Sequence, residues 1–592
     1  MTSSDDSSGS LARGQPGGGR LTATARTMFR FILTLLLTVT SVLGFINPII
    51  PGFNPDPSIL AVGDDYFIVT STFEFYPGHP IYHSKDLIDW KLIGHALNRP
   101  SQLRLYAGPP EGGIWAPTLR YYNGLYYLFT TNRWVYSSEL RQQSRSFYVT
   151  TNDIFGGVWS DPIYIDVLGY DPDIFVEDES DGTAWITRCD INNNTAKIYG
   201  IYQNKIDLAT GQQITPDELI FNGSLPLNST ARPEGPHLYK KDNYYYLLIA
   251  EGGTGVYHRS TIQRGPTPSG PWESYSGNPL IYNGVDPDPS TQPIQATGHS
   301  DIIQTADGQW WGTCLGIRPQ GGNMTRAQLG RETFLFPVTW TDDGWPVFNN
   351  NQSIGLVGPG LYNRTLDWSS FHDSYDSDKL DESYYYLRTP YAPIYSLTAR
   401  PGYLRLHGTP ISLGDRDTPS ILLRKQTAFN QLFETSLEFE PDSPKQEAGM
   451  TAFYSDFFHQ DIAVTQCPSG NGSRCVVWRW VVNNNATATS PVVIGNATNV
   501  TTQYYPIPAG PVKLAIKAEE TRYNFGYAVN GEEVSYVGSI DSVWVYSAPV
   551  GYSLFKGAHF GLYSQGGERS MFNNPADFDY WSQKTYKEDP VE

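Results

Sequence analysis

The feature that most constrains the fold of this chain of 592 residues is a hairpin pattern that occurs five times. Each copy opens on an acidic or aromatic side chain, runs to a turn at Asp or Asn, and returns as aromatic and apolar residues. Such runs around a short Asp or Asn turn predict two antiparallel strands. The opening residues of the five copies are Asp56, Trp115, Asp171, Glu234 and His299.

The spacing of the copies indicates how the hairpins are arranged. They begin 59, 56, 63 and 65 residues apart, and the turn residue lies eight positions after the opening residue in four copies and ten in one. A repeated all-β unit of this period, without the Leu spacing of a horseshoe or the helical pattern of a solenoid, predicts a five-bladed β-propeller. If each opening strand is the innermost of its blade, the five opening side chains converge at one end of the central channel. The alternative is a set of unrelated hairpins whose acids only form turns.

The chain is too long for one hydrophobic core, so two large domains are expected. The repeats predict a propeller over residues 45–360. Near residue 360 a Gly-rich stretch has the composition of a linker. No copy of the repeat follows. Residues 361–592 alternate short β runs with polar turns, which predicts one antiparallel β-sandwich.

The first 44 residues are predicted to lie outside the folded domains. Residues 1–27 are rich in Gly, Ser, Thr and Arg and are expected to be disordered. From Met28 to Gly44 a basic start precedes a short apolar run, which predicts a secretory signal peptide, and Met28 is an alternative initiator. A signal anchor is the competing interpretation, but the run is shorter than the about 20 residues that span a bilayer. We therefore expect an extracellular protein that is free of the membrane after cleavage.

Glycosylation motifs and cysteines agree with secretion. Cys467 and Cys475 flank a short loop and are predicted to form a disulfide, whereas Cys189 and Cys314 lie in strand-like runs typical of buried thiols. No Cys/His spacing resembles a zinc site. Ten Asn-x-Ser/Thr motifs predict a glycoprotein: Asn193, Asn222, Asn228, Asn323, Asn351, Asn363, Asn471, Asn485, Asn496 and Asn499.

The formal net charge is −19. An acidic excess of this size argues against nucleic acid or an anionic membrane as a partner and leaves a neutral sugar open.

Eight short motifs, in order along the chain, resemble glycoside hydrolase family 43, in particular its two-domain β-xylosidases. The resemblance runs from about residue 46 to the end and implies a five-bladed propeller followed by a concanavalin A-like sandwich. It also implies inverting, exo-acting removal of terminal β-1,4-linked xylose from xylooligosaccharides. The motifs are Asn54–Ser58, Ser71–Glu74, Gly113–Pro117, Asp171-Pro172, Pro233–Tyr239, Glu251–Gly253, Gly298-His299 and Leu329–Thr333.

The resemblance assigns roles to the three opening acids. An inverting glycosidase needs one carboxyl to protonate the leaving oxygen and another to activate water from the opposite face. By resemblance Asp56 is the general base and Glu234 the general acid, and Asp171 raises the pKa of Glu234 by charge repulsion. Asp173 is the rival for this third role; Asp171 is preferred because it is in register with the other two acids.

Five further residues are expected at the pocket by resemblance. Phe73 and Trp115 are predicted to form apolar walls, Arg331 to bind sugar hydroxyls, and Phe555 to line the mouth from the sandwich. His299 is expected at the floor, with a calcium ion possible beside it, although no cofactor is required. The alternatives are ordinary packing for Trp115, a buried core imidazole for His299 and a surface salt bridge for Arg331.

Three competing functions remain open on the sequence. An α-L-arabinofuranosidase acting on arabinoxylan or arabinan would use the same three acids. A non-catalytic carbohydrate-binding propeller is disfavoured because all three acids are present. A retaining hydrolase would use its first acid as a nucleophile, and the anomer of the first product distinguishes it.

Overall fold

The computed structural model describes residues 44–134, 143–165, 167–193, 195–228, 230–284, 292–321, 326–362, 364–469, 472–482, 499–542, 556–566 and 574–589. The predicted all-β class is confirmed, because these residues form strands and loops together with one short 3-10 helix, η2 (Asn349–Asn351). None of them belongs to a helix long and apolar enough to cross a membrane. The N-terminal 43 residues and Phe555 lie outside the described residues.

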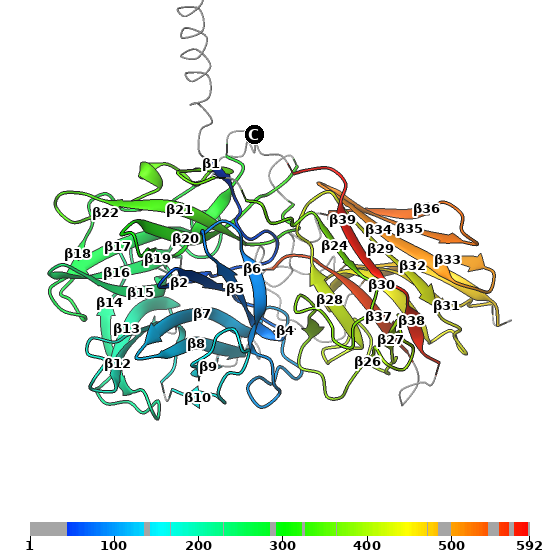
Figure 1. The fold of residues 1–592 in the computed structure, drawn as a ribbon, viewed down its shortest axis with the longest axis horizontal. Coiled ribbons are helices and arrows are strands. Elements are labelled where there is room, and N and C mark those ends of the chain that lie inside the picture. Colours follow the sequence, from blue (N-terminus) through cyan, green and yellow to red (C-terminus); the bar gives the residue numbers. More distant parts are fainter. Residues whose placement is uncertain are drawn as a thin grey trace, which may run out of the picture. The chain divides into compact units, whose positions relative to one another are not determined.

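Five four-stranded antiparallel sheets form the predicted propeller (Figure 1). The first two are β2 (Ser58–Val62), β3 (Asp65–Val69), β5 (Gly78–Ser84) and β6 (Lys91–Leu97), then β7 (Gly113–Tyr122), β8 (Leu125–Trp134), β9 (Gln143–Thr151) and β10 (Ile163–Tyr164). The third and fourth are β11 (Tyr170–Phe175), β12 (Thr183–Asn193), β13 (Ile198–Asp207) and β14 (Glu218–Phe221), then β15 (Glu234–Lys241), β16 (Tyr244–Glu251), β17 (Arg259–Gly265) and β18 (Glu273–Ser274). The fifth is β19 (Gln295–Gln304), β20 (Trp310–Ile317), β21 (Glu332–Trp340) and β22 (Pro346–Phe348).

Each of the five predicted hairpins is the inner pair of strands of one blade. β2 pairs with β3, β7 with β8, β11 with β12, β15 with β16, and β19 with β20. The opening strands β2, β7, β11, β15 and β19 contact one another in a closed ring. The repeat therefore places its opening residues around one channel, and the interpretation as unrelated hairpins is wrong.

The opening positions interrupt the regular ladder of their strands. The register shifts between Trp115 and Thr118, between Tyr170 and Asp173, and between Glu234 and His237. Asp56, Asp171 and His299 have φ of 53°, 53° and 52°, a region that few non-glycine residues adopt. Such irregularities re-aim a side chain away from the ladder, and they gather at functional sites.

The two ends of the propeller segment meet beside the fifth blade. β1 (Gly44–Ile46) pairs with β23 (Val357–Pro359), and Ile50 forms a bridge to Thr333 in β21. The Gly-rich stretch near residue 360 thus includes a paired strand in addition to its role as a connection. We keep residues 45–360 and 361–592 as the proposed domain bounds.

Two large antiparallel sheets form the sandwich (Figure 1). One contains β24 (Ser370–Asp373), β26 (Tyr395–Ser396), β27 (Leu404–Leu406), β29 (Gln431–Glu438), β34 (Val512–Glu519), β35 (Arg522–Val529), β36 (Ser535–Asp541), β38 (Ala576–Phe578) and β39 (Trp581–Thr585). The other contains β28 (Ile421–Lys425), β30 (Glu447–Ser455), β31 (Phe458–Gln466), β32 (Arg474–Val482), β33 (Asn499–Ile507) and β37 (His559–Gln565). Burial alternates along β29, so one face of this strand points into the core with Phe433 and Leu437.

The sandwich packs directly on the propeller. β25 (Tyr386–Leu387) pairs with the propeller strand β4 (Phe75–Tyr76). The amide of Ala558 donates to the carbonyl of Gln328 at 2.7 Å. At Gly330, whose φ is 69°, a Cβ atom would lie 2.5 Å from the backbone of Lys556 and Gly557. Glycine is therefore required where the two chain segments cross, one residue before Arg331.

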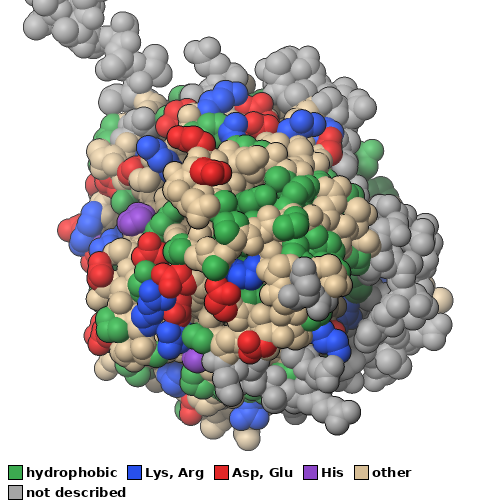
Figure 2. Space-filling model, turned by 90° about the vertical axis from the view of Figure 1, so that its right-hand side faces the viewer, with side chains coloured by type: hydrophobic (Ala, Val, Ile, Leu, Met, Phe, Trp, Pro, Cys, Tyr) green, Lys and Arg blue, Asp and Glu red, His purple; other side chains and the backbone are tan. Residues whose placement is uncertain are grey.

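A disulfide joins Cys467, the residue after β31, to Cys475 in β32, with the Cα atoms 5.1 Å apart. Cys189 and Cys314 are free and buried in blades three and five. Acidic and basic side chains are interspersed over the face of the molecule seen in Figure 2. The acidic excess is therefore not gathered into a single patch on this face.

Candidate active site

One pocket collects seven of the eight predicted site residues. Asp56, Trp115, Asp171, Glu234 and His299 all line it, as the repeat predicts for five converging opening residues. Phe73 and Arg331 complete its wall. Phe555 lies outside the described residues, so its predicted place at the mouth stays a prediction.

Asp56 is held by two side chains from other parts of the chain. Arg331 donates from Nη1 to Oδ1 at 2.8 Å, and the Ser71 hydroxyl donates to Oδ2 at 2.6 Å. His299 Nδ1 lies 3.8 Å from Oδ1. Burial raises the pKa of this carboxyl, but Arg331, His299 and Ser71 outweigh it and leave the pKa below the usual value. Asp56 is therefore ionised over the ordinary pH range.

The environment of Glu234 has the opposite effect. Burial raises its pKa most, and the charge of Asp56 adds to this, whereas Arg232, Arg133 and a hydrogen bond from Tyr170 at 3.3 Å oppose it. The net pKa lies above the ordinary value for a glutamic acid. One pocket thus holds an ionised carboxylate and a carboxyl that favours its protonated form.

Asp171 is buried beside Glu234 and accepts a hydrogen bond from the Gly235 amide at 3.0 Å. Burial, followed by the charges of Glu234 and Asp56, raises its pKa well above the usual value. Because neither carboxyl is easily ionised while the other is charged, Asp171 and Glu234 titrate as a pair. Burial is the main cause of the raised pKa of Glu234, and Asp56 is the carboxylate that adds to it, so the modulating role predicted for Asp171 stays a prediction.

Two imidazoles stand next to Asp56. Burial lowers the pKa of His299 to about 4 and that of His258 to about 3, so both are neutral near pH 7. His258 donates from Nδ1 to the carbonyl of Ala296 at 3.1 Å. A Cβ atom at Gly298 would lie 2.7 Å from the His258 ring, and one at Gly235 would lie 2.9 Å from the His299 ring. The glycines of two sequence motifs therefore make room for these rings.

Aromatic rings form one side of the pocket. The rings of Phe73 and Trp115 lie 5.6 Å apart, and Trp115 meets Tyr170 edge-on at 6.2 Å. The Trp115 indole N–H donates to the carbonyl of Glu111 at 2.9 Å, which fixes the ring. The guanidinium of Arg133 lies over the Trp115 ring, 4.4 Å from its centre. This wall suits the apolar face of a sugar ring.

The repeat does not identify four residues that also line the pocket: Tyr170, Arg232, Thr254 and His258. Tyr170 and Arg232 are close neighbours of Asp171 and Glu234 in the sequence, so adjacency to an opening residue is a usable signal. Thr254 and His258 belong to the connection between β16 and β17, where no repeated pattern exists.

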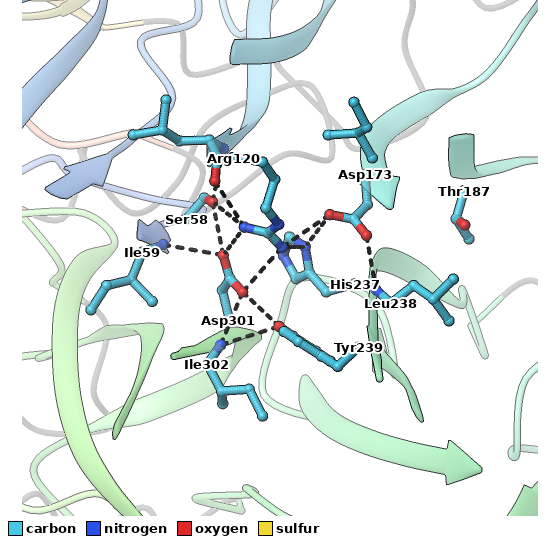
Figure 3. Close-up of polar contacts among 12 residues, drawn as sticks. Ser58, Ile59, Arg120, Asp173, Thr187, His237, Leu238, Tyr239, Asp301 and Ile302 are labelled. Atoms are coloured by element: carbon cyan, nitrogen blue, oxygen red, sulfur yellow. Dashed lines mark hydrogen bonds and ion pairs between the residues drawn. The ribbon is translucent and has the colours of Figure 1, made fainter. Parts of the chain in front are cut away.

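A second layer of polar side chains lies in the opening strands (Figure 3). Arg120 donates from Nη1 to Asp301 at 3.0 Å and from Nη2 to Asp173 at 3.0 Å. The same Nη2 donates to His237 Nδ1 at 3.1 Å, and Tyr239 donates to Asp301 at 2.5 Å. Asp173 is thereby committed to Arg120, whereas Asp171 lines the pocket. The two rivals for the third acidic role thus have different places.

The contacts of Arg120 also bear on metal binding, because they occupy the carboxylate of Asp301. Burial raises the pKa of Asp301, but Arg120 and its other partners outweigh this and hold it at about 2. Within the described part of the chain, no group of three or more His, Cys, Asp and Glu side chains is arranged to hold a metal ion. The possible calcium ion near His299 stays a prediction.

Comparison with known families agrees with the two-domain architecture. Residues 45–346 match the model described as "Glycosyl hydrolases family 43". Residues 372–584 match that described as "Beta xylosidase C-terminal Concanavalin A-like domain".

Similar proteins cover nearly the whole chain. A non-reducing end α-L-arabinofuranosidase of Bacteroides ovatus is 39% identical over 91% of this chain and 94% of its own. A xylosidase/arabinosidase 43B of Humicola insolens is 34% identical over 87% and 93%. The crystal structure of xylan β-1,4-xylosidase from Bacillus halodurans superposes with a TM-score of 0.80 at 33% identity, over 91% of this chain and 100% of that one.

Proposed function

The chain belongs to glycoside hydrolase family 43 and is a glycoside hydrolase, and from this premise we propose that it removes terminal β-1,4-linked xylose from xylooligosaccharides with inversion. The observation that carries the proposal is the contrast between two carboxyls in one pocket. Asp56 is held ionised, whereas Glu234 is held toward its protonated form. An inverting hydrolysis needs this pair of states at the same time.

In the proposed reaction Asp56 removes a proton from a water molecule that attacks the anomeric carbon. Glu234 gives its proton to the glycosidic oxygen as the bond to the leaving sugar breaks. The product acquires the opposite anomeric configuration, and Asp56 leaves the step protonated while Glu234 leaves it ionised. Proton exchange with solvent then restores both groups.

Each neighbour of the two carboxyls has a proposed part in this reaction. Arg331 keeps Asp56 charged and in place, and its guanidinium also offers donors to sugar hydroxyls. Asp171 shares the proton of the buried pair and orients the Gly235 backbone beside Glu234. Phe73 and Trp115 pack against the sugar ring.

Exo action is supported by the position of the sandwich. Its residues 556–558 pack against residues 328–330, immediately before Arg331 of the pocket. A domain at this place restricts the pocket to one end of a chain, which favours short xylooligosaccharides over internal attack.

A second candidate function is α-L-arabinofuranosidase activity on arabinoxylan or arabinan. It is favoured by the Bacteroides ovatus relative, whose name gives that activity and which is 39% identical over 94% of its own length. The same carboxyls would serve, so the difference lies in how the pocket walls fit a furanose or a pyranose ring.

We also propose that the protein acts outside the cell. The support is the predicted signal peptide over residues 28–44 and the glycosylation motifs. Among the motifs in the described residues, Asn222, Asn228 and Asn351 are exposed and open to a glycan. The Cys467–Cys475 disulfide agrees with an oxidising compartment.

Hydrolysis of 4-nitrophenyl β-D-xylopyranoside and 4-nitrophenyl α-L-arabinofuranoside by the secreted protein tests the two candidates. The β-xylosidase proposal expects the higher kcat/KM on the xyloside, and the reverse order selects the arabinofuranosidase. Glu234→Gln is expected to lower kcat on xylobiose by about 10²- to 10⁴-fold. Glu218→Gln, an exposed change of the same chemistry in β14, is the matched control and keeps wild-type activity.

A further inference from the structure

A second cavity lies between the propeller and the sandwich. It has a volume of about 470 Å³, within the range of about 300–1,000 Å³ typical of small-molecule sites. It shares no lining residue with the active-site pocket. Its walls come from the propeller, from the connection after residue 365, and from β28 of the sandwich.

Aromatic side chains supply much of the cavity wall. Trp368, Phe371 and Tyr385 line it from the sandwich side, and Tyr82 lines it from the propeller. The rings of Tyr82 and Trp368 lie 6.4 Å apart. The buried indole N–H of Trp368 has no hydrogen-bond partner. Flat rings with a free donor beside them suit a ligand that combines a ring face with oxygen acceptors.

Two adjacent cations of β28 also line this cavity without a carboxylate partner. Nε and Nη1 of Arg424 are buried and donate to no hydrogen-bond partner, while the guanidinium stacks on Phe371 at 3.1 Å from the ring centre. Lys425 donates only to uncharged groups, Asn54 at 2.8 Å and Tyr82 at 3.5 Å. In the described residues neither side chain forms an ion pair. Buried positive charge without a counter-charge is costly.

The acidic residues of the cavity lie on its solvent side. Asp367, Asp381 and Glu382 are exposed, and the side chain of Glu382 is 65% accessible. Asp381 acts on Arg424 only through space. Burial lowers the pKa of Lys425 to about 7 and that of Arg424 to about 10, although the charges of Asp381 and Asp373 oppose the shift of Arg424.

We propose that this cavity binds an acidic sugar, with its carboxylate between Arg424 and Lys425 and its ring against Trp368 and Phe371. A carboxylate supplies the missing counter-charge and accepts the unused donors of Arg424. The hydroxyls of the sugar face Ser383 and Gln431, which also line the cavity. A neutral sugar would fill the space but leave the Arg424 guanidinium without a counter-charge.

Isothermal titration with D-glucuronate tests the proposal, and D-xylose and inorganic phosphate serve as comparison ligands. The protein used is the full secreted chain carrying Glu234→Gln, so that binding is read independently of hydrolysis and of the proposed function. Glucuronate is expected to bind at least about tenfold more tightly than xylose or phosphate. For each ligand the affinity compared is the part that Arg424→Gln removes, because xylose can also enter the active-site pocket. Xylose of equal affinity at this cavity would overturn the acidic class, phosphate of equal affinity would overturn the sugar, and the absence of glucuronate binding would overturn the site.

Substitutions in the cavity wall test whether glucuronate binds at this cavity. Arg424→Gln is expected to weaken glucuronate binding by about tenfold or more, because a charge-assisted contact is lost. Lys513→Gln, which removes one positive charge from β34 outside the cavity, is the matched control and binds as before. Trp368→Leu, which changes no charge, is the second variant and is also expected to weaken binding. Unchanged binding in folded Arg424→Gln and Trp368→Leu proteins would refute the assignment.

Discussion

Replacing Arg331 by Gln should move the acid limb of the pH profile upward. The Arg331 guanidinium lies 2.8 Å from Asp56, and both side chains are almost fully buried. In the wild-type pocket this ion pair is the largest influence that lowers the pKa of Asp56. Without it, burial, which raises the pKa, is opposed only by His299, Ser71 and His258.

The size of the shift follows from the charge that is lost. An opposite charge at this distance lowers the pKa of an aspartate by about 1–3 units. Each unit corresponds to about 1.4 kcal/mol. Asp56 must be ionised to act as a base, so the loss of Arg331 should raise the acid limb of kcat/KM by about 1–3 pH units.

The measurement is kcat/KM for 4-nitrophenyl β-D-xylopyranoside against pH, since this parameter reports the ionisation of the free enzyme. Arg331→Lys is the matched control, because it keeps a positive charge near Asp56 and should shift the limb less. Loss of sugar contacts alone would lower kcat/KM equally at every pH. A folded Arg331→Gln protein whose acid limb stays in the wild-type position would refute the argument.

Three other expectations can be checked in parallel. Lys556→Met leaves the buried Glu74 carboxylate without its cationic partner and should lower the free energy of unfolding by about 3–5 kcal/mol, measured by urea titration. An unchanged urea midpoint would show that the ion pair contributes nothing to stability. Replacing both Cys467 and Cys475 by Ser opens a loop with a sequence separation of 8 and should cost about 2–3 kcal/mol, measured in the same way; a smaller loss means that the loop stays ordered without its bond. The first xylose released from xylobiose should be the α-anomer by NMR, and the β-anomer would select the retaining mechanism.

The repeat made the carboxyls of the pocket predictable because strand position and pocket lining coincide. Asp56 lies just before an inner strand, and Asp171 and Glu234 lie at the start of theirs, so one pattern in the sequence located all three. The repeat also aligns residues further along the inner strands, which the prediction did not use. Asp173, His237 and Asp301 follow their opening residues by two or three positions and form the layer around Arg120.

Other features depend on contacts that no local pattern records. His258 reaches the pocket from an irregular connection, where neither period nor turn chemistry fixes a direction. The raised pKa of Glu234 comes mainly from burial, which is a property of the assembled channel. Likewise, the two cations of β28 become notable only in the packed domains, where no acid of the described residues forms an ion pair with Arg424 or Lys425.

The contacts of Lys425 and Lys556 bear on how this enzyme can be engineered. Both lysines belong to the sandwich, yet Lys425 donates to Asn54, two residues before Asp56, and Lys556 pairs with Glu74, next to Phe73. A gene fragment that stops at residue 360 would remove both cations and expose the faces they cover. Module swapping in fusion enzymes should therefore exchange propeller and sandwich together, so that both contacts are kept.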